Sequence, residues 1–323
     1  MSTLPTVLVT APFDAEVATQ LDGLCTLVVS DPAEDAVSIA DGPHRETLSS
    51  VQVIVSEIDR VDQAALDLAP HLELVVSCRA MPVNVDKDAC EARGIALATT
   101  PARNADVTAD GAFGLLLDTV RQLSRSEAWF REGHWSAGDV FWPYREFRGP
   151  VLKNRVLGIV GGGAIGRRMA RRAAGFEMQV LIYDPFLTQA DIDGLGTLVD
   201  LPELMVQSDI VTVHAPLVDQ TRGLIGAKEL ALLKADAFVI NAGRAAIIDE
   251  QAMRDVLVDD RIQGAGFDVF WEEPLPSDHW LFGLDNVTMT PHIAGASDDV
   301  VAEHTRIAVG HIREWLASKD SAN

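Results

Sequence analysis

An apolar run that leads directly into a glycine-rich turn constrains this chain most. Residues 156–160 are apolar, and Gly161-Gly162-Gly163-Ala164-Ile165-Gly166 follows them at the start of a helix-like segment. In a dinucleotide-binding turn, the first glycine permits the tight turn, the second lets the backbone approach a pyrophosphate, and the third lets the helix pack on its strand. The alternative is a tight turn with no ligand. The predicted cofactor contacts here are Gly161, Gly163, Ala164, Ile165 and Gly166.

A second apolar run, residues 178–183, ends at Asp184. This acid lies about 20 residues beyond the glycine turn, where a side chain that binds the adenosine ribose is expected. A carboxylate accepts hydrogen bonds from a free 2′-hydroxyl and repels a 2′-phosphate, so the sequence predicts NAD in preference to NADP. Four arginines follow the turn and could favour the 2′-phosphate of NADP, but their place on the helix indicates that they form its solvated face. They are Arg167, Arg168, Arg171 and Arg172.

Composition restricts the class of protein. A chain of 323 residues exceeds the size at which a single core keeps growing, so two domains are expected. With 48% apolar and 23% charged residues it is typical of a folded, soluble protein. No apolar run approaches the ~20 residues that span a bilayer, and no secretion signal precedes the first strand, so a cytoplasmic location is predicted.

The cysteines and the charge exclude further classes. Cys25, Cys78 and Cys90 are odd in number and widely spaced, which favours reduced, buried thiols over disulfides or a zinc site, and no metal site is predicted. A formal net charge of −22 makes nucleic acids and anionic membranes poor partners. An anionic substrate must therefore be captured by local cations and backbone amides.

Short β-rich runs alternate with helical stretches along the chain, which is typical of parallel α/β architecture. The runs form two sets, and two separate parallel sheets fit them better than one. They lie near residues 6–10, 25–29, 51–55, 74–78 and 95–98, and near 156–160, 178–183, 210–214, 237–241, 262–267 and 287–290.

Two helices are expected to join the domains. Asn104 can cap a helix whose apolar face runs to Leu123, and Ser297 can begin a last helix that buries residues as far as Trp315. Because the second sheet is complete by Thr290, we expect the last helix to return to the first domain.

The expected domains are residues 1–101 with 296–323, and residues 102–295. The chain would cross between them near Pro101 and Pro291, and these crossings would act as hinges for closure over a substrate. Residues 135–148 are expected to form a loop, and they contain more aromatic residues than a loop usually does. This composition predicts either a subunit interface or local packing.

Three later segments add to the glycine turn, and together the motifs resemble those of the D-isomer-specific 2-hydroxyacid dehydrogenases, which include phosphoglycerate dehydrogenase and the glyoxylate and hydroxypyruvate reductases. The segments are Ile240-Asn241-Ala242-Gly243-Arg244, Gly266-Phe267-Asp268-Val269-Phe270-Trp271-Glu272-Glu273-Pro274 and Thr290-Pro291-His292-Ile293-Ala294-Gly295. The resemblance covers nearly the whole chain. It implies an α/β fold of two Rossmann- or flavodoxin-like doubly wound parallel-sheet domains with a cleft between them.

The resemblance also implies roles for individual residues. Arg244 would bind the substrate carboxylate through its planar fork, and His292 would be the general acid in reduction and the base in oxidation. Glu273 would keep the imidazole charged and oriented. Taken singly, each of the three is more often structural. The implied nicotinamide contacts are Asp268, Ala242, and His214 and Pro216 of a weaker fifth motif, His214-Ala215-Pro216-Leu217.

The first domain departs from the family pattern, in which a glycine-rich loop binds the substrate carboxylate. The corresponding segment, residues 78–86, has no glycine, and Pro82 contributes no N–H. Arg79, with Ala80 and Met81, would compensate by binding a carboxylate or a distal phosphate. The alternative for Arg79 is pairing with Asp86 or with another neighbouring residue. The remaining histidines, His304 among them, have no context that indicates a role.

The expected function is interconversion of a small anionic 2-oxo acid and its D-2-hydroxy acid with NAD, by a homodimer. The sequence leaves the substrate open. The chain ends soon after Trp315, so no additional regulatory domain is expected. Three alternatives remain: a formate dehydrogenase, which Glu273 disfavours; a non-enzymatic NAD(H)-sensing regulator or corepressor on the same fold; and a periplasmic sugar-binding protein, which the glycine turn opposes.

Overall fold

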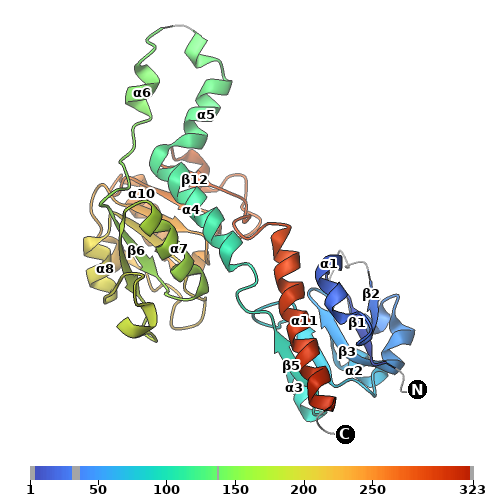
Figure 1. The fold of residues 1–323 in the computed structure, drawn as a ribbon. Helices are drawn as coiled ribbons and strands as arrows, with labels where there is room; N and C mark the ends of the chain where they lie inside the picture. Colours follow the sequence, from blue (N-terminus) through green and yellow to red (C-terminus); the bar gives the residue numbers. More distant parts are fainter. Residues whose placement is uncertain (1–3, 31–36, 137, 321–323) are drawn as a thin grey trace. The chain divides into compact units, whose positions relative to one another are not determined.

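The structure, a computed structural model, describes residues 4–30, 37–136 and 138–320. The chain divides into two compact units (Figure 1). Unit 1 comprises residues 1–104 and 297–323, and unit 2 comprises residues 105–296. Within the described ranges, no helix is both long enough and apolar enough to cross a bilayer.

Unit 1 contains a five-stranded parallel sheet in the order β2-β1-β3-β4-β5. The strands are short, β-branched and flanked by turn residues, as expected for a sheet buried on both faces. Their bounds are Thr6–Val9 (β1), Thr26–Val29 (β2), Val51–Ser56 (β3), Leu74–Ser77 (β4) and Ala96–Thr99 (β5).

Alternate residues of these strands pack on opposite faces of the sheet. Leu8, Ile54 and Val75 point to one apolar cluster with α2 (Gln63–Leu68) and α3 (Lys87–Ala92). On the other face, Ala308, Val309 and Ile312 of α11 (Asp299–Asp320) join the buried side of the sheet, as the sequence predicts for the last helix. The shorter helices are α1 (Ala15–Ala18), η1 (Thr19–Leu21), η2 (Ile39–Asp41) and η3 (Arg45–Ser50).

Unit 2 contains a seven-stranded parallel sheet in the order β12-β11-β10-β9-β6-β7-β8. The two parallel sheets confirm the predicted fold class. The sequence did not predict the two-residue strand β8. The bounds are Val156–Val160 (β6), Gln179–Tyr183 (β7), Thr197–Leu198 (β8), Ile210–Val213 (β9), Phe238–Asn241 (β10), Gly264–Phe267 (β11) and Val287–Met289 (β12).

Helices cover both faces of this sheet. The helices α4 (Ala105–Arg121) and α7 (Ala164–Gly175) pack on one face. The opposite face is covered by α8 (Leu201–Gln207), α9 (Ala227–Leu230) and α10 (Glu250–Val258). Short 3₁₀ turns lie at Gln189–Ile192 (η5), Ala245–Ile247 (η6) and Trp280–Gly283 (η7).

A helical arm projects from unit 2 beyond α4 (Figure 1). Gln122 has a left-handed conformation, with φ of 54°, and separates α4 from α5 (Leu123–Arg131). The chain returns through η4 (His134–Ser136) and α6 (Trp142–Glu146). The expectation of a loop over residues 135–148 is therefore wrong in part, because η4 and α6 lie there. Aromatic side chains stack within the arm, such as Trp129 on Trp142 at 5.1 Å, which agrees with the alternative of local packing.

The three cysteines are free and buried, as predicted. Burial raises the pKa of the Cys78 thiol to about 12, with the nearby carboxylate of Glu57 acting in the same direction. Cys78 is therefore an inert, protonated thiol at neutral pH.

Candidate active site

The candidate cofactor and catalytic residues of unit 2 follow six different strands. Gly161 follows β6, Asp184 follows β7, His214 follows β9, and the later motifs follow β10, β11 and β12. Parallel strands end at one edge of their sheet, so this placement gathers the residues along the carboxyl edge. Open α/β folds bind their ligands at that edge.

The glycine turn has the geometry that a dinucleotide requires. Gly161 adopts a φ of 101°, and a Cβ on Gly166 would lie 2.0 Å from the main-chain oxygen of Gly161. In contrast, a Cβ on Gly163 would meet no protein atom within 4 Å. The first and third glycines are therefore needed by the fold, whereas the second leaves open space at the start of α7, where a pyrophosphate would be received.

Asp184 is fixed against this turn. One carboxylate oxygen accepts the N–H of Gly162 at 3.0 Å, and the other accepts the N–H of Phe186 at 3.0 Å. The acid is held beside the glycines with acceptor capacity remaining, which fits a ribose hydroxyl. Residues present in the turn therefore fit a nicotinamide dinucleotide.

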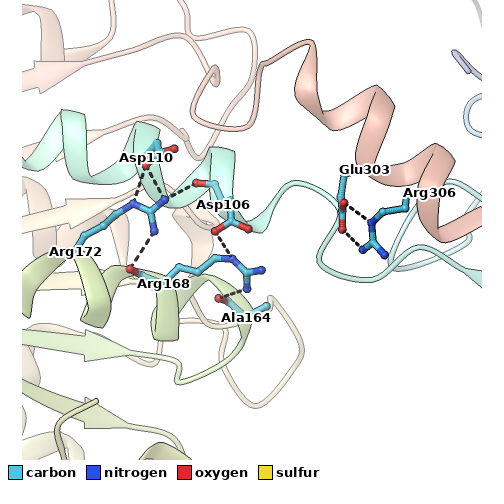
Figure 2. A network of polar contacts seen from close by, with 7 residues as sticks. All are labelled: Asp106, Asp110, Ala164, Arg168, Arg172, Glu303 and Arg306. Carbon is cyan, nitrogen blue, oxygen red and sulfur yellow. Dashed lines mark hydrogen bonds and ion pairs between the residues drawn. The ribbon is translucent and has the colours of Figure 1, made fainter. Parts of the chain in front are cut away.

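The arginines of α7 differ from the sequence expectation. Arg168 pairs with Asp106 of α4 at 2.7 Å, and Arg172 pairs with Asp110 at 2.6 Å (Figure 2). Neither is a simple solvated side chain, because each guanidinium joins α7 to α4. Arg171 is exposed as predicted.

Arg167 makes a further contact at the turn. Its Nε donates to the main-chain oxygen of Gly162 at 3.0 Å. This contact joins α7 to the glycine turn and uses one N–H donor of the guanidinium.

His292 and Glu273 form a direct pair. The Nδ1 of His292 lies 2.7 Å from Oε2 of Glu273, and the other carboxylate oxygen accepts the N–H of Phe270 at 2.9 Å. Burial acts to raise the pKa of Glu273, but the Phe270 N–H, the imidazole and the charge of Arg244 act oppositely and leave the pKa below its ordinary value. Glu273 is therefore ionised throughout the neutral range.

Asp268 holds the turn that carries His292. Its carboxylate accepts the hydroxyl of Thr290 at 2.6 Å and the N–H groups of Ile293 and Ala294, both at 2.8 Å. His292 itself has a φ of 55°, which is uncommon for a residue with a side chain. Three hydrogen bonds around one histidine keep this unfavourable conformation in place.

Arg244 lies on a loop that Asn241 organises. The buried side chain of Asn241 accepts the N–H of Gly243 at 3.0 Å and donates to the main-chain oxygen of Arg244 at 3.2 Å. Arg244 is exposed, and its Nη1 donates to the oxygen of Gly243 at 2.7 Å. The remaining donors of the guanidinium are available to a ligand.

His214 and Ala242 are buried at the ends of their strands. Burial lowers the pKa of His214 to about 4, so the ring is neutral at pH 7. Its Nε2 contacts the hydroxyl of Thr212 at 2.8 Å, and within the described residues its Nδ1 has no hydrogen-bond partner. A neutral, buried imidazole agrees with a shaping role rather than proton transfer. Pro216 follows two residues later on the same loop.

The candidate substrate residues Arg79, Ala80 and Met81 follow β4 in unit 1, and are not part of the unit 2 set. Arg79 does not pair with Asp86, which instead caps α3. Its Nε donates to the main-chain oxygen of Glu57 at 2.7 Å. The side chain of Met81 is exposed.

Sequence reasoning missed the residues that hold these loops. Asn241 and Thr290 lie inside the motifs that contain Arg244 and His292. Each is a polar residue at the end of a strand, and this position was the signal that could have indicated a structural role for it. In unit 1, Asn84 donates to the main-chain oxygen of Asp59 at 3.0 Å and accepts from Ser77 at 3.0 Å. It thereby joins the loops after β3 and β4.

Comparison with known proteins identifies the family. Residues 113–294 match the model of the D-isomer specific 2-hydroxyacid dehydrogenase NAD-binding domain. The chain belongs to the D-isomer specific 2-hydroxyacid dehydrogenase family. The expectations of that family, of an enzyme and of a nicotinamide cofactor are thereby confirmed.

Similar proteins cover nearly the whole chain. A putative 2-hydroxyacid dehydrogenase, YoaD, of Bacillus subtilis is 33% identical over 97% of this chain and 92% of its own. A glyoxylate reductase of Thermococcus litoralis is 38% identical over 85% of this chain and 86% of its own. The solved 2-hydroxyacid dehydrogenase of Ketogulonicigenium vulgare is 27% identical, with a TM-score of 0.77 over 98% of this chain and 96% of that one.

Proposed function

We propose that this chain reduces a small 2-oxo acid to its D-2-hydroxy acid with NADH, and catalyses the reverse oxidation with NAD. The observation that carries the proposal is the 2.7 Å pair of His292 and Glu273 at the sheet edge that also holds the glycine turn. A proton donor and a dinucleotide turn on one edge are the two requirements of the reaction.

His292 supplies the proton. Its Nδ1 faces the Glu273 carboxylate, so Nδ1 carries a proton and Nε2 is the nitrogen left for the substrate. When bound, the nicotinamide supplies the hydride. During reduction Nε2 donates its proton to the carbonyl oxygen, and during oxidation it takes the hydroxyl proton back. Glu273 stays ionised and stabilises the charged ring.

Arg244 binds the substrate carboxylate. A guanidinium is always charged and presents paired donors that match a carboxylate. The fixed loop conformation given by Asn241 orients that fork. We propose that Arg79 adds a second cation for the same carboxylate, in place of the amides of a glycine-rich loop. These local charges oppose the repulsion of a chain with net charge −22.

The cofactor contacts are proposed as the sequence assigns them. Gly161, Gly163, Ala164, Ile165 and Gly166 would bind the pyrophosphate, and Asp184 would bind the ribose and select NAD over NADP. His214, Pro216, Ala242 and Asp268 would border the nicotinamide. Their positions along one edge of the unit 2 sheet support this assignment.

Steady-state kinetics test the proposal. The purified chain should consume NADH with at least one short 2-oxo acid, and NADPH should be a poorer donor. His292→Ala should lower turnover roughly 10²- to 10⁴-fold, the contribution of a positioned proton donor, with unchanged NADH affinity. His71→Ala, at an exposed histidine of unit 1, is the matched control.

A His292→Ala variant whose turnover lies within about tenfold of wild type would show that His292 is not the proton donor. Binding of NADH without turnover on any acid would favour the regulator alternative.

We also propose that the chain forms a homodimer through the helical arm. The arm exposes a group of large apolar side chains, which mark an interaction surface when they are contiguous. They are Phe130, Trp135, Phe141, Trp142 and Tyr144. Beside the arm lies a hollow of about 860 Å³, lined in part by Arg125, Glu146 and residues of β12, which a second copy could fill. Light scattering should give twice the chain mass, and Phe141→Asp with Tyr144→Asp should halve it. A single-chain mass for the wild type would contradict the dimer.

A further inference from the structure

The carboxyl edge of the unit 1 sheet carries a charged cluster that the sequence does not bring together. Glu57 follows β3, Arg79 follows β4, Arg103 lies beyond β5, and His304 lies on α11. All four belong to unit 1. Because this edge is where open α/β sheets receive ligands, the cluster is placed to contact a substrate.

Glu57 is the centre of the cluster. Its main-chain oxygen accepts from Nε of Arg79 at 2.7 Å, and its Oε1 accepts from Nη2 of Arg103 at 2.5 Å. The side chains of Glu57 and Arg103 are only 15% and 20% exposed. A charge-assisted hydrogen bond that is shielded from water fixes the orientation of the Glu57 carboxylate.

His304 holds Arg103 from the other side. Its Nε2 lies 2.5 Å from the main-chain oxygen of Pro12, which can only accept, so Nε2 carries the proton. Its Nδ1 therefore accepts from Nη1 of Arg103, at 3.2 Å. Burial is the main cause that lowers the pKa of His304, in agreement with a neutral ring. The cluster then contains two cations and one anion.

Two polar groups in this cluster remain available. Within the described ranges of the chain, Oε2 of Glu57 and both Nη atoms of Arg79 make no hydrogen bond or ion pair with protein atoms. The free fork of Arg79 matches a carboxylate. The free oxygen of Glu57 accepts a hydrogen bond from a donor and repels an anion.

We propose that Glu57, oriented by Arg103 and His304, is a specificity-determining residue that accepts a hydrogen bond from a hydroxyl on the substrate tail, beside the carboxylate bound by Arg79. This inference rests on the proposed dehydrogenase function. The substrate class is a 2-oxo acid with a hydroxylated third carbon. A second carboxylate or a phosphate on that carbon is rejected, because Glu57 repels it and Arg103 is already paired.

Three probes that differ only at the third carbon test the subsite: pyruvate with hydrogen, hydroxypyruvate with a hydroxyl, and oxaloacetate with a carboxylate. The measurement is kcat/KM with NADH for the full chain, for Glu57→Gln and for Glu73→Gln. Glu73 is the matched control because it belongs to the same unit but immediately precedes β4, at the opposite edge of the sheet, where it binds Trp315.

The wild type should prefer hydroxypyruvate over pyruvate by at least about tenfold, as one hydrogen bond to a charged group allows. Glu57→Gln should bring that ratio within about threefold of unity and raise the relative rate on oxaloacetate, because the charge is removed. Glu73→Gln should leave both ratios unchanged. If Glu57→Gln does not fold, Glu57→Asp keeps the charge but shortens its reach, and should lose the hydroxyl preference while still rejecting oxaloacetate.

The proposed subsite would be contradicted if the wild-type kcat/KM values for hydroxypyruvate and pyruvate were nearly equal. It would also be contradicted if their ratio were the same in the wild type and in Glu57→Gln. Either result leaves the dehydrogenase function intact, because turnover is still observed. The absence of turnover on every 2-oxo acid would instead contradict the proposed function, and this inference with it.

Discussion

His292 depends on two acids that act in different ways. Glu273 contacts the ring directly, whereas Asp268 binds the backbone on the far side of the turn. The first acid orients the imidazole through Nδ1, and the second keeps the uncommon backbone conformation of His292. Loss of either acid should reduce turnover, but only Glu273 should change how turnover depends on pH.

Replacement of Glu273 by Gln should remove the acid limit that this carboxylate places on turnover. An amide can still accept the hydrogen bond from Nδ1, but it does not titrate, so turnover should no longer fall when the pH drops below the pKa of Glu273. The lowered pKa of Glu273 means that its carboxylate is lost only below the ordinary range for glutamate, so the wild-type profile should not fall near pH 5 on its account.

The pH profile of kcat/KM checks this prediction. Glu272→Gln is the matched control, since the neighbouring glutamate is exposed and contacts neither His292 nor Arg244 through any hydrogen bond in the described residues. An unchanged profile for Glu273→Gln would show that the pair does not govern proton transfer.

At the scale of elements, the glycine turn and α7 act as one piece. Gly166→Ala should destabilise the fold, because its Cβ would overlap the oxygen of Gly161, whereas Gly163→Ala should fold normally and bind NADH more weakly. Gly175→Ala, at the end of the same helix, has open space and should change neither property.

Thermal melting and NADH titration separate these outcomes. Equal NADH affinity for Gly163→Ala and Gly175→Ala would show that the open space at Gly163 does not receive the cofactor.

The ion pairs between α4 and α7 should contribute little to stability. Asp106 is mostly exposed although Arg168 is largely covered, so the pair is partly screened by water. A double-mutant cycle of Asp106→Asn and Arg168→Gln should give a coupling of about 0.2–1 kcal/mol in the free energy of unfolding. A coupling above about 2 kcal/mol would mean that these helices depend on the pair.

Local sequence patterns predicted most elements of both sheets. Strand β6 and its glycine turn were recognisable because an apolar run and glycines have fixed roles over a few residues. Strand β8 was not, since two residues carry no periodicity. The split of α4 from α5 at Gln122 was also hidden, because the apolar pattern continues across a residue that takes an unexpected left-handed conformation.

At the scale of the whole molecule, contacts between distant residues set the limit of prediction. Arg244, Glu273 and His292 could be predicted as site residues because each stands in a recognisable motif. The pairing of Arg103 with His304 joins residues 201 positions apart, and neither stands in such a motif. Nor could the sequence show that Arg168 and Arg172 pair with α4, because the partner acids lie on another helix.

The configuration of the 2-hydroxy acid product is the most direct test of the proposed reaction. The purified full chain is incubated with NADH and one acid at a time: pyruvate, hydroxypyruvate or oxaloacetate. The 2-hydroxy acid formed in each reaction is then resolved on a chiral column. The proposed reaction requires that at least one acid is reduced and that only the D-isomer appears. Formation of the L-isomer, or no hydroxy acid from any sample, would contradict it.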